Sequence, residues 1–495
     1  MNKKIDPILI QENSTIKEAM ECITKAGLRI VLIVDKNKKL LGITTDGDIR
    51  RALLSGKDFN TSIKEIMTVN PITAREDTST TELLEKMLEK GIHEIPVVNK
   101  DGIVIDIVFL HELKTIPLSA PDITHKDIGL INEVLATPYL SIGPKIKEFE
   151  KKVADYIGVK YAVGVNSGTS GLHLCVRSLD IKDGDEVITT PFSFIASANC
   201  ILFERAKPVF VDIDENTLCI DADKIEEKIT KRTKAILPVH IFGHPCEMDK
   251  IMEIAKKHNL AVIEDACESI GAEYKGKKVG SFGNCGVFAF YPNKQITTAE
   301  GGMIVTDNEK IAKLCQSMRN QGRDEGDAWL SHTRLGYNYR MSELSAALGV
   351  SQIDRIGEIL KKRQQVADFY NKKLNKIKGV IVPYVARGVK ISWFVYVIRL
   401  DSEKFSREDR NKVIQELENR GINCRDYFPP IHLEPFYVKM FGYKRGNFPI
   451  TETVSDLTIA LPFYNNLTEG EIDYICNSLE SIINRFKNEG FISLI

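Results

Sequence analysis

An ungapped internal repeat near the start of the 495-residue chain constrains the fold more than any other feature. The stretch that begins at Ser14 matches, at an offset of 64 residues, a stretch that ends at Ile116. In each copy an apolar pattern of helical spacing ends at a glycine, Gly27 or Gly91, and two short apolar strands follow around a polar turn. One such unit cannot bury both faces of its small sheet, so the two copies are expected to pack together.

The first copy carries a distinctive sequence where its second strand meets the following helix. This sequence is GITTDGDIRR, residues 42–51, and it offers the Thr45 hydroxyl and the Asp48 carboxylate. A hydroxyl at a strand-to-helix turn suits an anion, and a carboxylate can accept hydrogen bonds from a ribose diol. The second copy has Phe109 and Glu112 at these positions, so at most one good nucleotide site is expected.

The repeat and its motif resemble a tandem CBS domain over residues 1–117, with repeats at about 7–60 and 66–117. The resemblance implies that Thr45 contacts a phosphate, and Asp48 the ribose hydroxyls, of an adenine or cytidine nucleotide. The alternative is that the pair binds no ligand and serves only for packing or dimerisation. Residues 118–127 lie in a proline-containing segment with little periodicity, so they are expected to form a linker.

The overall composition argues against several classes of partner. The chain has 67 Lys and Arg against 68 Asp and Glu, which gives no general attraction to nucleic acid or anionic membranes. No apolar run approaches the roughly 20 residues that span a bilayer. The 10 cysteines are scattered without metal-binding spacing, as in reduced cytosolic proteins. We therefore expect a cytoplasmic protein with no metal site, no membrane segment and no nucleic-acid partner.

From about residue 128, helical and strand-like segments alternate with short connections. This alternation predicts an α/β fold with a large, mostly parallel sheet that helices cover on both faces. Ligands bind such sheets at the carboxyl ends of the strands. The expected strands are 161–165, 186–190, 208–211, 235–238, 261–264 and 303–306.

Two motifs follow predicted strands in this segment. Small residues open a helix at Gly168 and Thr169, where free N–H groups suit a phosphate, although an ordinary strand–helix turn uses the same residues. Another strand ends in Glu264 and Asp265, and only one of these carboxylates can easily face a site. That carboxylate suits a protonated ring nitrogen, although a helix N-cap would also explain an aspartate there.

Two further motifs lie later in the segment. Lys294 stands between an aromatic run and a pair of glycines, whereas most lysines are solvated surface charges. A catalytic amine would need its pKa lowered by burial or by neighbours. Asn338 and Arg340 lie among tyrosines before an amphipathic helix, and the planar fork of arginine suits a phosphate. The alternative is a surface loop capped by Ser342.

Together and in this order, the motifs resemble the DegT/DnrJ/EryC/StrS family of nucleotide-sugar aminotransferases. The resemblance covers nearly all of residues 125–480 and implies a PLP-dependent transferase type I fold. It predicts a large domain at 128–374, a small C-terminal α+β domain at 375–495, and a homodimer or higher oligomer with sites at the interface. Other matching segments are 140–144, 238–240, 300–302, 429–433 and 461–462.

The resemblance also implies roles for individual residues. Lys294 would carry pyridoxal 5'-phosphate (PLP) as a Schiff base and shuttle a proton, and Asp265 would pair with the ring nitrogen so that the ring acts as an electron sink. Phe194 would stack on the ring, unless it is simply a core phenylalanine. The phosphate would be held by four residues, the last two from the neighbouring subunit: Gly168, Thr169, Asn338 and Arg340.

Two positions depart from the family pattern. Many relatives have a phosphate-contacting serine five residues before the lysine, where this chain has Ala289. Many have glutamine or histidine three residues after the aspartate, near the cofactor hydroxyl, where this chain has Glu268. A carboxylate at this cofactor-binding position would change the local protonation in a direction that the sequence leaves open.

The implied reaction moves an amino group from an amino acid, L-glutamate above all, to a nucleotide-linked keto-sugar in surface-glycan or nonulosonic-acid precursor biosynthesis. One alternative is a PLP-dependent sugar dehydratase-like enzyme, but such relatives have histidine where this chain has Lys294. Another is a catalytically silent nucleotide-sensing scaffold, against which the intact Lys294 and Asp265 argue. His432 could contact the substrate or make a structural hydrogen bond.

Overall fold

The two copies of the repeat fold into the same elements with the same boundaries. The helix and the two strands of the first copy recur 64 residues later as the pairs α1 (Ile16–Ala26) and α3 (Thr80–Lys90), β2 (Ile30–Val34) and β6 (Glu94–Val98), and β3 (Leu40–Thr45) and β7 (Val104–Phe109). An irregularity in the sheet register recurs as well, at Ile33/Val34 and at Val97/Val98. The fold expected for this part of the chain is confirmed.

The structure is a computed structural model that describes residues 5–113, 115–324, 326, 328 and 331–489. The chain divides into two compact units. Unit 1 consists of Met1–Ile116 with Asn419–Ile422, and unit 2 of Pro117–Glu418 with Asn423–Ile495. Among the described residues, no helix has the length and apolar character needed to cross a bilayer.

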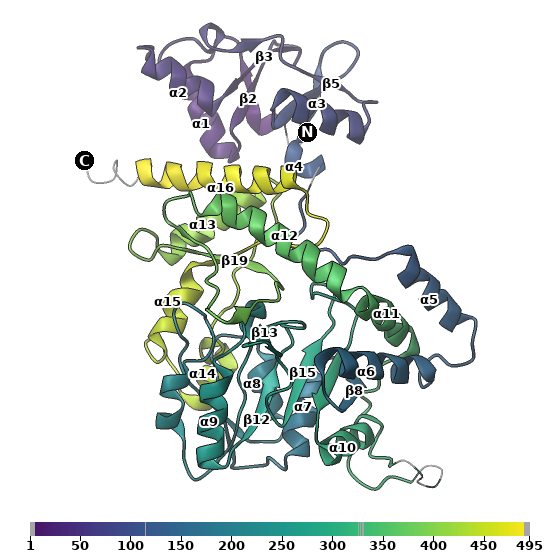
Figure 1. Ribbon diagram of the computed structural model, residues 1–495. Helices are drawn as coiled ribbons and strands as arrows, with labels where there is room; N and C mark the ends of the chain where they lie inside the picture. Colours follow the sequence, from purple (N-terminus) through teal and green to yellow (C-terminus); the bar gives the residue numbers. More distant parts are fainter. Residues whose placement is uncertain (1–4, 114, 325, 327, 329–330, 490–495) are drawn as a thin grey trace. The chain divides into compact units, whose positions relative to one another are not determined.

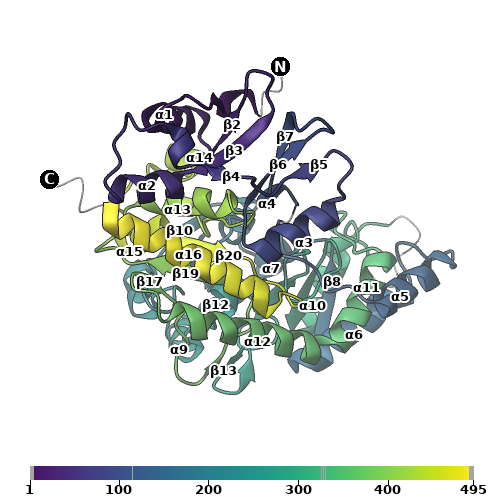
Figure 2. The same cartoon turned by 90° about the horizontal axis from the view of Figure 1, so that it is seen from above.

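Unit 1 holds two small sheets, of order β1-β2-β3-β4 and β5-β6-β7 (Figure 2). Backbone hydrogen bonds join them, from Leu40 N to Gly102 O at 3.0 Å and from Val104 N to Lys38 O at 3.1 Å. The sequence repeat therefore forms a pseudo-symmetric pair, as expected. Its remaining elements are β1 (Leu9–Gln11), α2 (Asp46–Leu54), β4 (Thr68–Val69), β5 (Ala74–Arg75) and α4 (Leu110–Leu113).

Unit 2 is built on a seven-stranded sheet, seen in the teal part of Figure 1. In spatial order its strands are β10 (Lys207–Phe210), β9 (Glu186–Thr189), β11 (Thr233–Ile236), β12 (Ala261–Asp265), β15 (Cys285–Ala289), β16 (Gly302–Thr306) and β8 (Tyr161–Val165). All neighbouring pairs from β10 to β15 are parallel, and only β16 runs against its neighbours. The predicted mostly parallel sheet is confirmed.

Helices and a long apolar core surround this sheet. Its strands are almost fully buried. Every residue of β9 and β16 is buried, and so is every residue of β12 except Ala261. A sheet covered on both faces needs such uninterrupted apolar strands. The helices of this part are α5 (His125–Leu135), α6 (Pro144–Ile157), α7 (Gly168–Ser178), α8 (Ala196–Leu202), α9 (Met248–His258), α10 (Glu309–Arg319), α11 (Glu343–Asp354) and α12 (Ile356–Leu374).

The C-terminal part of unit 2 contains a second, three-stranded sheet of order β17-β19-β20. Its strands are β17 (Val380–Ile381), β19 (Tyr396–Leu400) and β20 (Thr458–Leu461). Its helices are α13 (Arg407–Glu418), α14 (Pro435–Phe441), α15 (Pro449–Leu457) and α16 (Glu469–Glu489). A third small sheet joins β14 (Lys277–Lys278), β13 (Glu273–Tyr274) and β18 (Val389–Lys390).

The segment expected to be a linker, 118–127, is fastened within unit 2. Asp122 is 8% exposed and accepts hydrogen bonds from Arg355, Lys362 and Asn465 at 3.0–3.2 Å. These donors hold the pKa of Asp122 below its ordinary value despite the opposing effect of burial. Thr124 caps α5, so residues 125–127 of the expected linker are already helical. The path of the segment is fixed by polar contacts that sequence periodicity does not reveal.

Candidate active site

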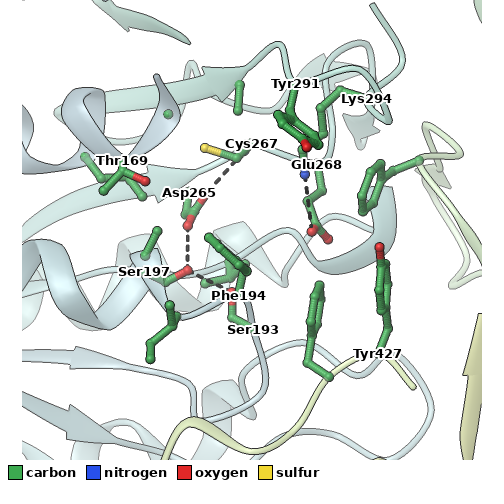
Figure 3. Close-up of a pocket in the computed structure, with 18 of the residues that line it drawn as sticks. Thr169, Ser193, Phe194, Ser197, Asp265, Cys267, Glu268, Tyr291, Lys294 and Tyr427 are labelled. Carbon is green, nitrogen blue, oxygen red and sulfur yellow. Dashed lines mark hydrogen bonds and ion pairs between the residues drawn. The ribbon is translucent and has the colours of Figure 1, made fainter. Parts of the chain in front are cut away.

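A cavity of about 880 Å³ lies at the carboxyl ends of the central strands (Figure 3). Four segments at this edge line it: the end of β12, the loop after β15, the beginning of α7 and the beginning of α8. Residues 425–429 close another side. This is the edge at which a parallel sheet was expected to bind its ligand.

Asp265 presents its carboxylate to this cavity from the end of β12. The side chain is 4% exposed, and the Ser197 hydroxyl donates to its Oδ2 at 2.7 Å while the Cys267 N–H donates to its Oδ1 at 3.1 Å. The adjacent Glu264 is fully buried and accepts three backbone N–H bonds, from Gly280, Phe282 and Gly283. Of the two carboxylates, Asp265 is therefore the one that faces the site.

Lys294 enters the cavity from the loop after β15. Its side chain is only 13% exposed, and its Nζ lies 3.5 Å from Oε1 of Glu268 and 3.9 Å from the centroid of the Phe394 ring. An ammonium over an aromatic face is stabilised by the ring quadrupole. Lys294 is thus held in place inside the site and is not a solvated surface lysine.

The first turn of α7 forms a cradle on the cavity wall. Gly168 and Thr169 line the cavity there, and a Cβ on Gly168 would stand 2.8 Å from Cβ of Ala289 and 2.9 Å from Sγ of Cys267. Backbone N–H groups at a helix start attract anions, and a glycine lets them approach closely. The cradle suits a phosphate, and Ala289 borders it with a methyl group instead of a hydroxyl.

Phe194 projects into the site at the start of α8, as Figure 3 shows. Its side chain is 59% exposed, which excludes the alternative of a core phenylalanine. Asn338 and Arg340 are absent from the described residues that line the cavity of their own chain. Instead, Arg340 donates to Oδ1 of Asn320 at 3.1 Å, and the carbonyl of Asn338 accepts from Asn166 at 3.5 Å.

The sequence matches the DegT/DnrJ/EryC1/StrS aminotransferase family over residues 121–480 and the CBS domain over residues 1–55 and 63–117. The chain belongs to the DegT/DnrJ/EryC1/StrS aminotransferase family. It is a PLP-dependent sugar aminotransferase preceded by a tandem CBS domain, as the sequence motifs implied.

Individual relatives cover nearly all of the aminotransferase part. GDP-perosamine synthase from Caulobacter vibrioides is 40% identical over 376 residues, which span 76% of this chain and 100% of the relative. The spore coat polysaccharide biosynthesis protein SpsC from Bacillus subtilis is 37% identical over 378 residues, 74% of this chain and 97% of SpsC. The solved structure of Helicobacter pylori PseC, an aminotransferase involved in the biosynthesis of pseudoaminic acid, superposes with a TM-score of 0.72 at 29% identity, covering 75% of this chain and 100% of PseC.

The residues that line the aminotransferase cavity fit PLP. The α7 cradle offers N–H groups for a phosphate, Asp265 offers a fixed carboxylate for a cationic ring nitrogen, and Lys294 offers an amine for an aldehyde. Phe194 adds an aromatic face. These residues match four features of PLP: its phosphate, its ring nitrogen, its aldehyde and the face of its ring.

The sequence did not reveal several residues that support the side chains of Asp265 and Lys294 or close the cavity. Ser193 and Ser197 form a relay to Asp265, with 2.7 Å between their hydroxyls. Phe394 lies under Lys294, and Tyr427 closes the cavity from the C-terminal part. The only available signal was the pair of serines four residues apart after a strand, because the other two contacts join segments distant in sequence.

His432 makes a structural hydrogen bond in this aminotransferase. It is fully buried, and its Nε2 lies 3.0 Å from Oε1 of Glu452. Burial lowers the pKa of His432, although the Glu452 carboxylate opposes this effect. The neutral ring therefore donates from Nε2, and the structural alternative is the one that the geometry supports.

Thr45 and Asp48 form a helix cap in the CBS part. The Thr45 N–H and hydroxyl donate to Oδ2 of Asp48 at 2.8 and 2.7 Å, and the Asp48 N–H donates to the Thr45 hydroxyl at 3.3 Å. Arg51 also pairs with Asp48. This reciprocal capping box gives both residues a structural role at the start of α2.

Proposed function

We propose that the enzyme transfers the amino group of L-glutamate to a keto-sugar carried by a nucleotide, in the cytoplasm, during the synthesis of surface-glycan or nonulosonic-acid precursors. The observation that carries the proposal is the convergence of Lys294, Asp265 and the α7 cradle on one large cavity. The similarity to GDP-perosamine synthase and to PseC, whose names refer to sugar products, supports the acceptor class.

PLP, when bound, supplies an aldehyde carbon and an electron-withdrawing ring. The protein then has four tasks. Gly168 and Thr169 bind the phosphate through their N–H groups, Asp265 holds the proton of the ring nitrogen, and Phe194 covers the ring. Nζ of Lys294 would move a proton from the donor's α-carbon to the cofactor in the first half-reaction, and from the cofactor to the acceptor's carbon in the second. The cavity, at about 880 Å³, has room for a sugar beside the cofactor.

The proposal includes a homodimer in which the partner completes the site. Asn338 and Arg340 carry the polar groups expected at the phosphate, yet they are not among the described residues lining their own cavity. Several large apolar residues are exposed in α5 and in the loops that precede α6 and α11, and exposed apolar surface is typical of a face that a permanent partner covers. These residues are Ile128, Leu135, Tyr139, Leu140, Ile142 and Leu335.

The direct test is an amination assay with L-glutamate and a panel of GDP-, UDP- and dTDP-linked keto-sugars, followed by mass spectrometry. We expect one member of the panel to gain an amino group and L-glutamate to become 2-oxoglutarate. The Lys294→Ala variant controls for background amination. Loss of water from a sugar without amination would favour the dehydratase alternative instead.

We further propose that an adenine or cytidine nucleotide binds near Thr45 and Asp48 and alters the activity. The intact GITTDGD motif in the first repeat supports this second function. Asp48→Asn should abolish any nucleotide-induced rise in melting temperature or change in turnover. Glu18→Gln is the matched control, because Thr15 and Glu18 form the same kind of capping box on α1. A nucleotide response that survives Asp48→Asn would refute the assignment.

A further inference from the structure

A buried carboxylate faces the amine of Lys294. Glu268 is 4% exposed, and its Oε1 lies 3.5 Å from Nζ of Lys294. Figure 3 shows the two side chains pointing toward each other. The two side chains come from different segments, since Glu268 follows β12 and Lys294 follows β15. A buried charge without a partner is strongly unfavourable, so each of these two groups stabilises the charge of the other.

The carboxylate is fixed by contacts on its other side. The N–H of Phe242 donates to Oε2 at 2.9 Å, and Gln295 Nε2 donates to the carbonyl of Glu268 at 2.7 Å. Gln295 in turn donates to Ser392, so the Glu268 backbone is tied to the C-terminal part. Oε1 is thereby left facing Lys294.

The donor to Oε2 sits on a strained backbone. Phe242 has φ = 52°, a left-handed conformation that costs a non-glycine residue about 1–2 kcal/mol. Its ring stacks on Phe428, with centroids 5.5 Å apart, and this packing helps to hold it. Strained residues that persist in a fold often serve a site, and here the strain directs one N–H to Glu268.

We propose that Glu268 is a positioning residue that acts through Lys294: its carboxylate pairs with the Nζ ammonium, holds the amine in place and sets the pH at which Nζ becomes free to react. This inference rests on the function proposed above for Lys294.

Several neighbouring groups act on the charge of Glu268. Burial raises the pKa of Glu268, while the Lys294 ammonium and the Phe242 N–H lower it and the Asp265 charge raises it. Two other titratable groups face the pair, Cys267 from the same loop and Tyr427 from the C-terminal part. Burial raises the pKa of both, so they stay neutral at neutral pH and add no charge beside the pair.

The experiment measures how readily Lys294 reacts in the cofactor-free protein as the pH changes. A small amine-reactive acylating reagent is applied across a pH series, and labelling of the Lys294 peptide is quantified by mass spectrometry. The variant is Glu268→Gln, which keeps the shape of the side chain and cannot take a proton. Glu434→Gln is the matched control, because Glu434 is another carboxyl residue on the cavity wall.

We expect the labelling midpoint of Lys294 to fall by about one pH unit or more in Glu268→Gln, because an opposite charge within about 4–6 Å favours the ammonium by that amount. The same midpoint in Glu268→Gln, Glu434→Gln and the unmodified protein would overturn the proposal and leave Glu268 a structural role. If Glu268→Gln does not fold, Glu268→Asp is used instead. Its carboxylate stands farther from Nζ of Lys294, so the labelling midpoint should fall by a smaller amount.

A second readout separates this inference from the proposed function. PLP is added to each protein, and the pH dependence of the visible absorbance band is recorded. A shifted midpoint in Glu268→Gln supports the role of Glu268. If the unmodified protein forms no band while the labelling midpoint still shifts, the proposed function fails and the pairing of Glu268 with Lys294 stands.

Discussion

At the scale of single residues, the site works because neighbours hold each polar group in a fixed direction. The Ser197 hydroxyl and the Cys267 N–H donate to the two oxygens of the Asp265 carboxylate. The Glu264 carboxylate points away from the cavity and accepts hydrogen bonds from three backbone N–H groups. The residues by themselves left open which member of the acidic pair faces the ligand, and the family resemblance assigned that role to Asp265. That choice depends on Gly280, Phe282 and Gly283, which approach only in the folded chain.

The Ser197→Ala variant tests this support at Asp265. Removing a hydrogen bond to a charged group costs about 1.5–3 kcal/mol, so PLP affinity should fall by roughly tenfold or more. Absorbance titration with PLP measures the change. Ser193→Ala, which removes the outer member of the relay, should have a smaller effect. Equal affinity in Ser197→Ala and the unmodified enzyme would show that Asp265 needs no such support.

His432 gives a prediction for pH. Burial lowers its pKa below the ordinary 6.5, so the unfolded chain binds the proton more tightly than the folded enzyme. The stability from the neutral ring is therefore present above about pH 6.5 and lost as the pH falls below it. The melting temperature of the enzyme should drop more steeply from pH 7 to pH 5 than that of His432→Gln. Parallel curves would contradict this.

At the scale of elements, the apolar pattern predicted most of the large sheet. Each of the six expected strands lies within about two residues of an observed one. The missing strand, β15 (Cys285–Ala289), was interpreted only as an aromatic run before Lys294, because its alternation of small and large residues is short. The path of 118–127 was also not predictable, since buried ion pairs with Arg355 and Lys362 fix it.

The Gly302→Ala variant tests the cradle at the start of α7. A Cβ at this position would lie 2.6 Å from the carbonyl oxygen of Ser167 and 2.8 Å from N of Gly168. The helix start must shift, and overpacking of this kind costs about 1–3 kcal/mol. Both the melting temperature and PLP affinity should fall.

The matched control for the cradle is Gly129→Ala. Gly129 lies in α5 with open space around its Cβ position, and alanine favours a helix by up to about 1 kcal/mol. This variant should leave PLP affinity unchanged. A similar loss of affinity in both variants would contradict the role assigned to the cradle.

At the scale of the whole molecule, the sequence predicted a tandem CBS domain followed by an aminotransferase, and the family match confirms both parts. The acceptor sugar was not predictable, because several segments distant in sequence line the cavity together. Residues 425–429, for example, come close to the sheet only after the chain has folded. The subunit arrangement likewise depends on surfaces that a single chain does not complete.

Mixed dimers test the shared site. Lys294→Ala and Arg340→Ala should each be nearly inactive alone, the first without its amine and the second without its phosphate ligand. When the two are mixed under exchange conditions, one site per mixed dimer regains both native residues. Activity should then rise to about a quarter of the unmodified level, since half of the dimers are mixed. No recovery on mixing would mean that Arg340 serves its own subunit.

The most direct test of the central claim is the absorbance spectrum of the purified, PLP-loaded enzyme before and after addition of L-glutamate. We predict a visible band that gives way to the shorter-wavelength band of the aminated cofactor, and no such change in Lys294→Ala. A visible band that L-glutamate leaves unchanged would contradict the proposed donor, and the absence of any band would contradict the assignment of Lys294 and Asp265 to the cofactor.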